Sequence, residues 1–128
     1  MKHRSEEDWK EGFEQAADLY INEIKKQPSD EIIAEIRKLN NPYDPKWVAM
    51  WSILGERKER AIGFKLINIL ESYDNAASFI KREHCVQAIF KILEINDFAL
   101  SILITGPTND FNLNYFKLGI KLLKKYSS

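Results

Sequence analysis

The chain has 128 residues, of which 45% are hydrophobic, and its 19 lysine and arginine residues balance its 19 aspartate and glutamate residues. A chain of this length buries roughly two-thirds of its unfolded surface, so we expect a single domain over residues 1–128. Zero formal charge argues against general coating of nucleic acid, because that mode of binding depends on excess positive charge.

The cysteine content and the first ten residues bear on location. The single cysteine, Cys85, excludes an internal disulfide framework and favours a reducing compartment. The opening segment, MKHRSEEDWK, lacks the apolar run of a signal peptide. Together these features predict a cytoplasmic protein.

The first predicted helix covers residues 5–27. It opens with Ser5-Glu6-Glu7-Asp8, which matches a capping box, and Pro28 ends it. Apolar residues recur at helical spacing along one face, namely Trp9, Phe13, Ala16, Tyr20 and Ile24. This stripe predicts the face that packs on the core.

Capping residues predict the next helices. Ser29 is expected to cap a helix that ends at Asn40, and Asp44-Pro45 is expected to begin another. Gly55 is predicted to end that third helix. A fourth helix follows between Glu56 and Tyr73.

The segment after Tyr73 has weaker periodicity. Asp74 is predicted to cap a helix that starts at Asn75, with a kink or break near residues 81–84. From Cys85 onward the helix is apolar on nearly every side, which is typical of a buried helix.

The most apolar window of the chain is Val86–Ile104, in which 13 of 19 residues are apolar. Lys91, Glu94 and Asp97 interrupt it, and charges at bilayer depth cost a few kcal/mol each. We therefore interpret the window as the centre of a soluble core and not as a membrane span.

The last helix is predicted from about Thr108 or Asp110 to Tyr126, after Asp97 caps a short helix that closes at Gly106. The spacing predicts that its main buried residues are Phe111, Tyr115, Leu118 and Leu122, with a wider face formed by Phe116, Ile120 and Leu123. Its lysines could also suit a membrane surface, but we expect the core to need the apolar face, and we predict no membrane association.

These patterns predict an all-α fold, a compact irregular bundle of about seven helices. No window shows sustained period-2 alternation, so a sheet is not expected. The segments 44–73, 74–96 and 97–126 loosely resemble stacked helical hairpins. A short HEAT-like or armadillo-like stack is therefore the alternative.

An acidic strip is predicted on the first helix. Glu7, Glu11, Glu14 and Asp18 are spaced 4, 3 and 4 residues apart, so they share the face opposite Trp9. The strip is a candidate contact for a basic partner, and the plainer interpretation is a solvated helix face.

A basic corner is predicted where the fourth helix begins. Arg57, Lys58 and Arg60 lie where the helix dipole disfavours cations, although Glu56 and Glu59 partly offset them. Exposed backbone N–H groups and guanidinium groups suit an anion or an acidic partner. A solvated, salt-bridged turn is the alternative.

Trp47 and Trp51 share a helix face. If exposed they would be interface anchors, since Trp dominates binding hot spots, and otherwise they belong to the core.

The sequence carries no motif for catalysis, a cofactor or a metal. His84 and Cys85 are neighbours whose side chains point about 100° apart on a helix, so they do not form a nucleophile–base pair. Two histidines and one cysteine make no zinc site. We predict no catalytic residue, and an enzyme would have to depend on carboxylates alone.

These observations favour a non-enzymatic protein–protein interaction module, such as a small adaptor, inhibitor or immunity-type protein with an unknown partner. The acidic first helix and the basic last helix also permit a homo-oligomer. The alternative is nucleic-acid binding on a basic face formed by Arg57, Arg60, Lys81, Arg82 and the C-terminal lysines, which predicts strong salt dependence.

Overall fold

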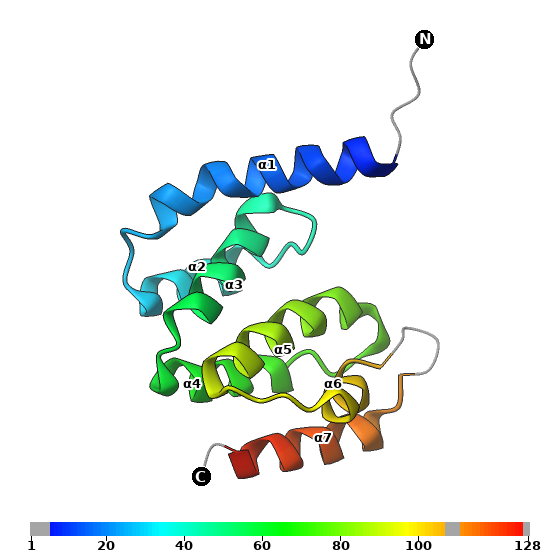
Figure 1. The fold of residues 1–128 in the computed structure, drawn as a ribbon. Coiled ribbons are helices and arrows are strands. Elements are labelled where there is room, and N and C mark those ends of the chain that lie inside the picture. Colours follow the sequence, from blue (N-terminus) through cyan, green and yellow to red (C-terminus); the bar gives the residue numbers. More distant parts are fainter. Residues whose placement is uncertain (1–5, 107–110, 127–128) are drawn as a thin grey trace. The chain divides into compact units, whose positions relative to one another are not determined.

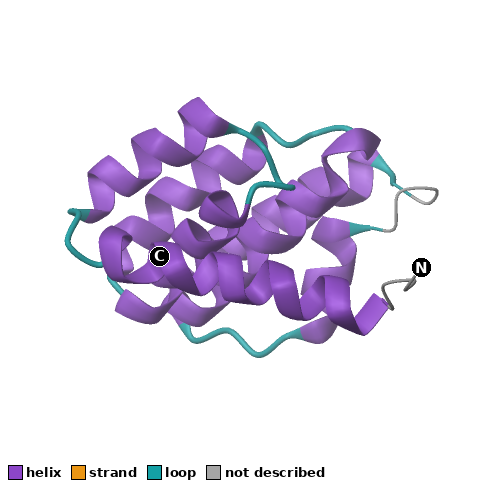
Figure 2. Ribbon diagram, turned by 90° about the horizontal axis from the view of Figure 1, so that it is seen from above, coloured by secondary structure: helices purple, strands orange, loops and turns teal. Residues whose placement is uncertain are grey.

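The computed structural model describes residues 6–106 and 111–126, without the side chains of residues 6–11 and 13. Over this part the chain is helical and contains no strand (Figures 1 and 2). The helices are α1 Glu6–Ile24, α2 Ser29–Leu39, α3 Pro45–Arg57, α4 Arg60–Glu71, the short 3₁₀ helix η1 Ala76–Ser78, α5 Phe79–Leu93, α6 Phe98–Thr105 and α7 Leu113–Tyr126. The predicted all-α class is confirmed.

The chain divides into two compact units, Met1–Ile53 and Leu54–Ser128, called here unit 1 and unit 2. Unit 1 holds α1, α2 and most of α3, and unit 2 holds the later helices. The single domain predicted over residues 1–128 stays a prediction, and so does the choice between a bundle and a HEAT-like stack.

Helix α2 begins without the side-chain cap predicted at Ser29. The structure places Ser29 inside the helix and Pro28 at the N-cap, where its extended backbone (φ −61°, ψ 150°) accepts the N–H of Ile32 at 3.1 Å. The prediction for Ser29 is wrong because proline already supplies the N-cap conformation. The predicted cap of α3 is confirmed, since the N–H of Lys46 donates to Asp44 Oδ1 at 2.9 Å.

Helix α3 continues through Gly55, which was predicted to end it, and stops at Lys58, whose backbone is left-handed (φ 50°). Gly55 is buried, and a Cβ there would lie 3.5 Å from the Cα of Ala88 and 3.2 Å from the side chain of Lys91. The close approach of α5 therefore explains the glycine, and packing outweighs its low helix propensity of about 1 kcal/mol.

Unit 2 consists of two helical hairpins. Helix α4 packs on α5, α6 packs on α7, and α5 joins the two pairs through its contact with α6 (Figure 1). Gly119 permits the approach of α6 and α7, because a Cβ there would come within 2.5 Å of Ile104 Cγ1. A side chain at this position would require the buried side chain of Ile104 to move.

Helix α5 runs unbroken from Phe79 to Leu93, so the break predicted near residues 81–84 is absent. The weak periodicity has a specific cause. Arg82 points into the protein and is 0% exposed, so a charged residue occupies a position of the buried face.

The guanidinium of Arg82 ties four segments of unit 2 together. Its Nε donates to the carbonyl oxygen of Thr105 at 2.9 Å, and its Nη1 donates to those of Tyr73 at 3.0 Å and Asn75. The ring of Phe111 stacks on it, with the centroid 4.3 Å from Cζ. Burial lowers the pKa of Arg82, and the backbone carbonyls and aromatic face compensate for part of the lost hydration.

The apolar window Val86–Ile104 is split between α5 and α6. Glu94 adopts a left-handed conformation (φ 55°) that ends α5, and the N–H of Leu100 donates to Asp97 Oδ1 at 3.0 Å, which confirms the predicted cap. The buried residues of the window are Val86, Ala88, Ile89, Ile92, Leu93, Ile95, Leu100 and Ile104. In the part of the chain described, no helix is both long and apolar enough to cross a bilayer.

Candidate functional site

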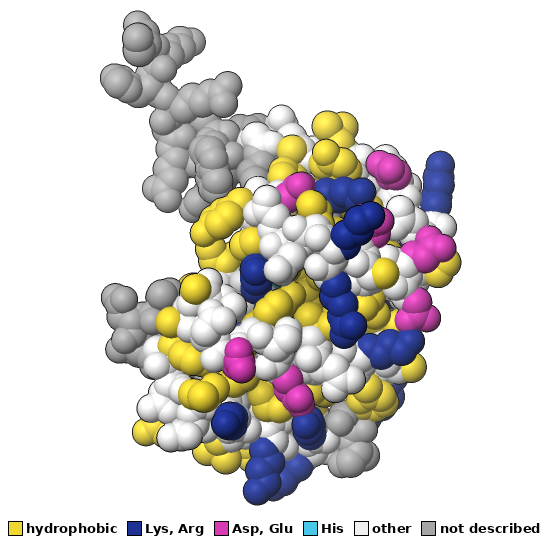
Figure 3. All heavy atoms as spheres, turned by 180° about the vertical axis from the view of Figure 1, so that it is seen from behind, with side chains coloured by type: hydrophobic (Ala, Val, Ile, Leu, Met, Phe, Trp, Pro, Cys, Tyr) yellow, Lys and Arg dark blue, Asp and Glu magenta, His cyan; other side chains and the backbone are white. Residues whose placement is uncertain are grey.

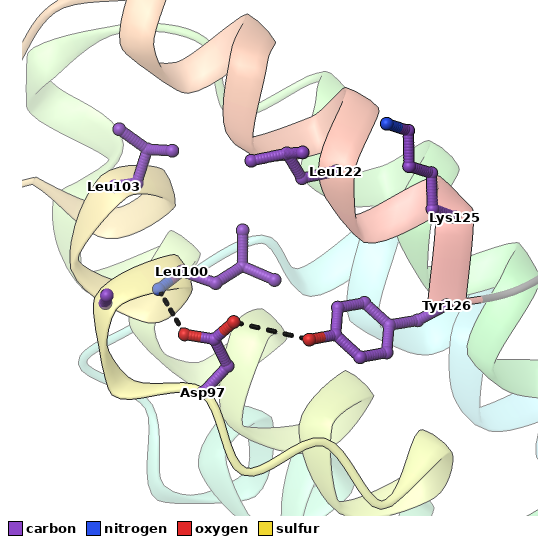
Figure 4. Close-up of a pocket in the computed structure, with 7 residues that line it drawn as sticks. Asp97, Leu100, Leu103, Leu122, Lys125 and Tyr126 are labelled. Carbon is purple, nitrogen blue, oxygen red and sulfur yellow. Dashed lines mark hydrogen bonds between the residues drawn. The ribbon is translucent and has the colours of Figure 1, made fainter.

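A groove of about 610 Å³ lies between α6 and α7 in unit 2. Its walls are mostly apolar, and Leu103 of α6 and Leu122 of α7 lie on its two sides, with Leu100 between them (Figure 4). The lining is Asp97, Ala99, Leu100, Leu103, Leu122, Lys125 and Tyr126. A groove of this size lined by leucines from two helices is suited to binding an apolar group.

Polar groups close one end of the groove. The hydroxyl of Tyr126 donates to Asp97 Oδ2 at 3.3 Å, while Asp97 Oδ1 accepts the N–H of Leu100 (Figure 4). Burial, the charge of Asp97 and this hydrogen bond together raise the pKa of Tyr126. This hydrogen bond joins the C-terminal end of α7 to the residue that caps α6.

The outer face of α7 exposes two apolar side chains that the sequence predicted to be buried. Tyr115 is 59% exposed and Leu118 is 47% exposed, so the prediction that they are buried is wrong. The face that packs inward is displaced by one residue and consists of Phe116, Gly119, Ile120 and Leu123. The physical reason is the contact of Gly119 with Ile104, which fixes the rotation of α7 about its axis.

Other apolar side chains of the hairpin are exposed outside the groove. Phe98 at the start of α6 is 79% exposed, Ile102 of α6 lines a separate hollow against α5, and Leu113 of α7 lines one against α4. Clusters of exposed apolar side chains with a polar rim are typical of interaction sites, whereas single ones are common on any protein. The α6–α7 hairpin therefore carries the strongest candidate surface.

Lysines of α7 border this surface, and of these Lys125 lines the groove, while Lys117, Lys121 and Lys124 line a second hollow with Glu71 and Asp74. Helix α7 contains Lys117, Lys121, Lys124 and Lys125 and no acidic residue, and all four lysines are exposed. Figure 3, which views the molecule from behind, shows Lys and Arg side chains grouped with hydrophobic ones along the lower edge, where α7 lies. Lys124 forms an ion pair with Glu71 of α4.

The predicted basic corner is engaged in contacts within unit 2. Arg60 Nη2 donates to the carbonyl oxygen of Tyr126 at 3.2 Å, and Lys58 Nζ lies 3.7 Å from Glu94 Oε1. Both contacts are with the C-terminal ends of helices, where cations are favourable. These contacts offset the unfavourable interaction of the two cations with the helix dipole at the start of α4. Arg57 is half-buried at the end of α3.

The acidic strip lies partly outside the described residues. Glu14 and Asp18 are exposed on α1, whereas the side chains of Glu7 and Glu11 are outside the part that the structure describes. The strip as a contact surface stays a prediction.

Trp47 and Trp51 are buried, at 0% and 2% exposure. Their rings pack edge to face with centroids 5.6 Å apart, and Trp47 Nε1 donates to the carbonyl oxygen of Ile36 at 3.2 Å. This arrangement fits the core interpretation of the pair, and we assign both residues to packing.

The residues with nucleophilic or metal-binding potential are dispersed or shielded. Cys85 is buried, its thiol contacts the carbonyl oxygen of Leu66 at 3.5 Å, and burial raises its pKa well above the usual value. Burial also lowers the pKa of neighbouring His84. Within the described ranges, no three His, Cys, Asp or Glu side chains come together to hold a metal.

The basic face considered for nucleic acid requires a correction. Arg82 was expected on that face, but it is fully buried and bonded to backbone carbonyls, so it cannot reach a phosphate. Because the periodicity around Arg82 is weak, the sequence does not indicate that its side chain points into the core.

Comparisons of the chain with protein-family models, curated proteins and solved structures gave no match. The site is therefore defined by its own geometry.

Sequence reasoning missed the groove, although one signal was present. The apolar residues of α7 span a wider arc than one packing face uses, and the excess could have indicated a second surface.

Proposed function

We propose that this chain is a non-enzymatic protein–protein interaction module, such as an adaptor, inhibitor or immunity-type protein. We further propose that its contact surface is the α6–α7 hairpin, centred on the groove. The observation that supports this is an apolar groove lined by leucines of both helices, with Tyr115 and Leu118 of α7 exposed outside its lining. Apolar cores with polar rims are characteristic of protein interfaces.

The chemistry of the groove favours binding over catalysis. Its lining contains one carboxylate, that of Asp97, and this group already accepts hydrogen bonds from Leu100 and Tyr126. The lining holds no second carboxylate to form an acid–base pair with Asp97. We propose no catalytic residue, cofactor or metal.

The predicted charged surfaces keep a secondary place in this proposal. The acidic strip lies on α1, and the basic corner lies where α4 begins. We propose that both add electrostatic steering or specificity to binding and contribute little of the affinity. A homo-oligomer stays a prediction, which light scattering at low and high salt would test. We place the protein in the cytoplasm, consistent with one cysteine buried as a thiol.

The experiment is affinity capture from the source organism with three baits: the parent chain, a Tyr115→Ser/Leu118→Gln variant and an Arg57→Glu/Arg60→Glu variant. Circular dichroism verifies that each bait is folded. The proposal predicts that a protein captured by the parent is lost from the groove variant, and that the purified pair binds directly.

A partner that binds the groove variant as tightly as the parent would contradict the assigned surface. If the corner variant alone loses the partner, the charged corner is the contact instead. Capture of nothing by any bait would count against an interaction module.

A further inference from the structure

We propose that the groove between α6 and α7 binds one amphipathic helix with acidic flanks, contributed by another protein. This inference rests on the proposed function and specifies the class of partner. Three features of the hairpin support it: the shape of the groove, the length of its apolar surface and the sign of the charge along its rim.

The shape suits a helix. Helices α6 and α7 form the two walls, and leucine side chains from both line the space between them. Recognition of a helix in a groove uses apolar anchors at i, i+3 or i+4, and i+7 of the partner. The apolar anchors along one face of the partner helix would fit between Leu103 and Leu122.

The apolar surface is longer than a small ligand requires. Tyr115 and Leu118 are exposed on α7 but lie outside the groove lining, so they continue its apolar wall toward the start of the helix. Helix α7 has 14 residues, which corresponds to about 21 Å at 1.5 Å per residue. A partner helix of about three to four turns would cover this length.

The charge of the rim selects an acidic partner. Lys125 lines the groove and lies one turn from Leu122. Lys121 lies one turn from Leu118, outside the groove lining, and also borders the hollow that Glu71 and Asp74 line. Helix α6 carries no charged residue, and the carboxylate of Asp97 accepts hydrogen bonds from inside the hairpin. Glutamate or aspartate beside the apolar anchors of the partner would complement these lysines.

A membrane surface shares part of this chemistry and is distinguished by experiment. Lysines beside an apolar face also suit anionic lipid. The apolar residues here line a concavity, however, and Asp97 lies at its end, whereas a lipid surface favours a protruding face free of carboxylates.

The test uses three fluorescein-labelled 18-residue peptides and the full chain, with binding measured by fluorescence anisotropy. The first peptide has leucines at the spacing of a helix face and glutamates beside them. The second replaces every glutamate with lysine, and the third replaces every leucine with glutamine. We expect the first to bind, the second to bind at least about tenfold more weakly, and the third not to bind.

Variants of the chain locate the site. Leu118→Gln and the pair Lys121→Glu/Lys125→Glu should each weaken binding of the first peptide by about tenfold or more. The double charge reversal should also improve binding of the lysine peptide. The matched control is Lys65→Glu, which reverses an exposed charge on α4 outside the groove and should leave both affinities unchanged.

Equal affinity for the glutamate and lysine peptides would overturn the acidic specificity, and binding that survives Leu118→Gln would overturn the location. Binding to vesicles of phosphatidylcholine and phosphatidylserine without peptide binding would replace the helix with a membrane. Self-association of the chain that is abolished by Leu118→Gln would assign the groove to a second copy.

The two proposals fail in different ways. If no peptide binds but a captured partner protein depends on Leu118, the acidic helix is wrong and the interaction module stands. If neither a peptide nor a captured protein depends on this surface, both proposals are wrong.

Discussion

The two apolar faces of α7 differ in what covers them. The inner face, formed by Phe116, Gly119, Ile120 and Leu123, is buried against α4 and α6. The outer face is one residue removed along the chain, and its members Tyr115 and Leu118 are about half exposed. Both faces carry large apolar residues, so their presence alone does not decide which face folds inward.

The deciding feature is a close contact. Gly119 lets Ile104 approach the backbone of α7, and this fixes the helix with its inner face against the core. The residues left outside are then available for a partner. The inner face of α7 therefore supplies stability, and the outer face is the one that we propose supplies binding.

The largest expected effect is on the inner face. Leu123 is 0% exposed, so Leu123→Ala should lower the free energy of unfolding by about 2–5 kcal/mol. Leu118→Ala should lower it by less than about 1 kcal/mol, since Leu118 is already partly hydrated. Urea denaturation of both variants provides the measurement. Equal losses would erase the distinction between the two faces.

The next effect concerns Arg82, which links α5 to the end of α6 and to the segment that follows α4. Arg82→Met keeps much of the side-chain volume but leaves the carbonyl oxygens of Thr105, Tyr73 and Asn75 without their donor. We expect a loss of about 2–4 kcal/mol in the free energy of unfolding, since unpaired buried polar groups cost about 1–3 kcal/mol each and part of the loss relaxes. A variant as stable as the parent would show that the guanidinium is dispensable.

A smaller effect is expected at the basic corner. Arg60→Gln removes an exposed hydrogen bond to the carbonyl oxygen of Tyr126, so stability should change by at most about 1 kcal/mol. The change should shrink further at high salt. A large, salt-independent loss, measured by the same denaturation, would mean that this contact organises the end of α7.

The smallest effect is a pH dependence from His84. Burial lowers its pKa in the folded state, so the folded protein binds fewer protons than the unfolded chain just below pH 6.5. Its contribution to stability is therefore full above about pH 6.5 and falls as the pH drops toward the lowered folded pKa. His84→Gln should flatten the stability profile between pH 7 and pH 5, and an unchanged slope would contradict this assignment.

The sequence predicted the helices well where local chemistry determines them. Asp44 and Asp97 cap helices because a carboxylate two or three residues from a free N–H is sufficient. The prediction for Gly55 is wrong because its role depends on Ala88 and Lys91 of α5, which lie more than 30 residues away in sequence.

The site was less predictable for the same reason. Helix α7 has two adjacent apolar faces, and the packing of Ile104 against Gly119 determines which of them is buried. The direction of Arg82 likewise depends on carbonyl groups that two other segments, the end of α6 and the connection after α4, bring together. Neither arrangement follows from helical periodicity alone.

The most direct test of the outer face is a titration of the ¹⁵N-labelled chain with the glutamate–leucine peptide, followed by two-dimensional NMR. The account predicts that backbone amide shifts change at Ala99, Leu103, Leu118 and Leu122, while those of Ile89 and Ile92 in the buried part of α5 stay in place. Shift changes confined to other helices, or none at peptide concentrations that saturate anisotropy, would contradict it.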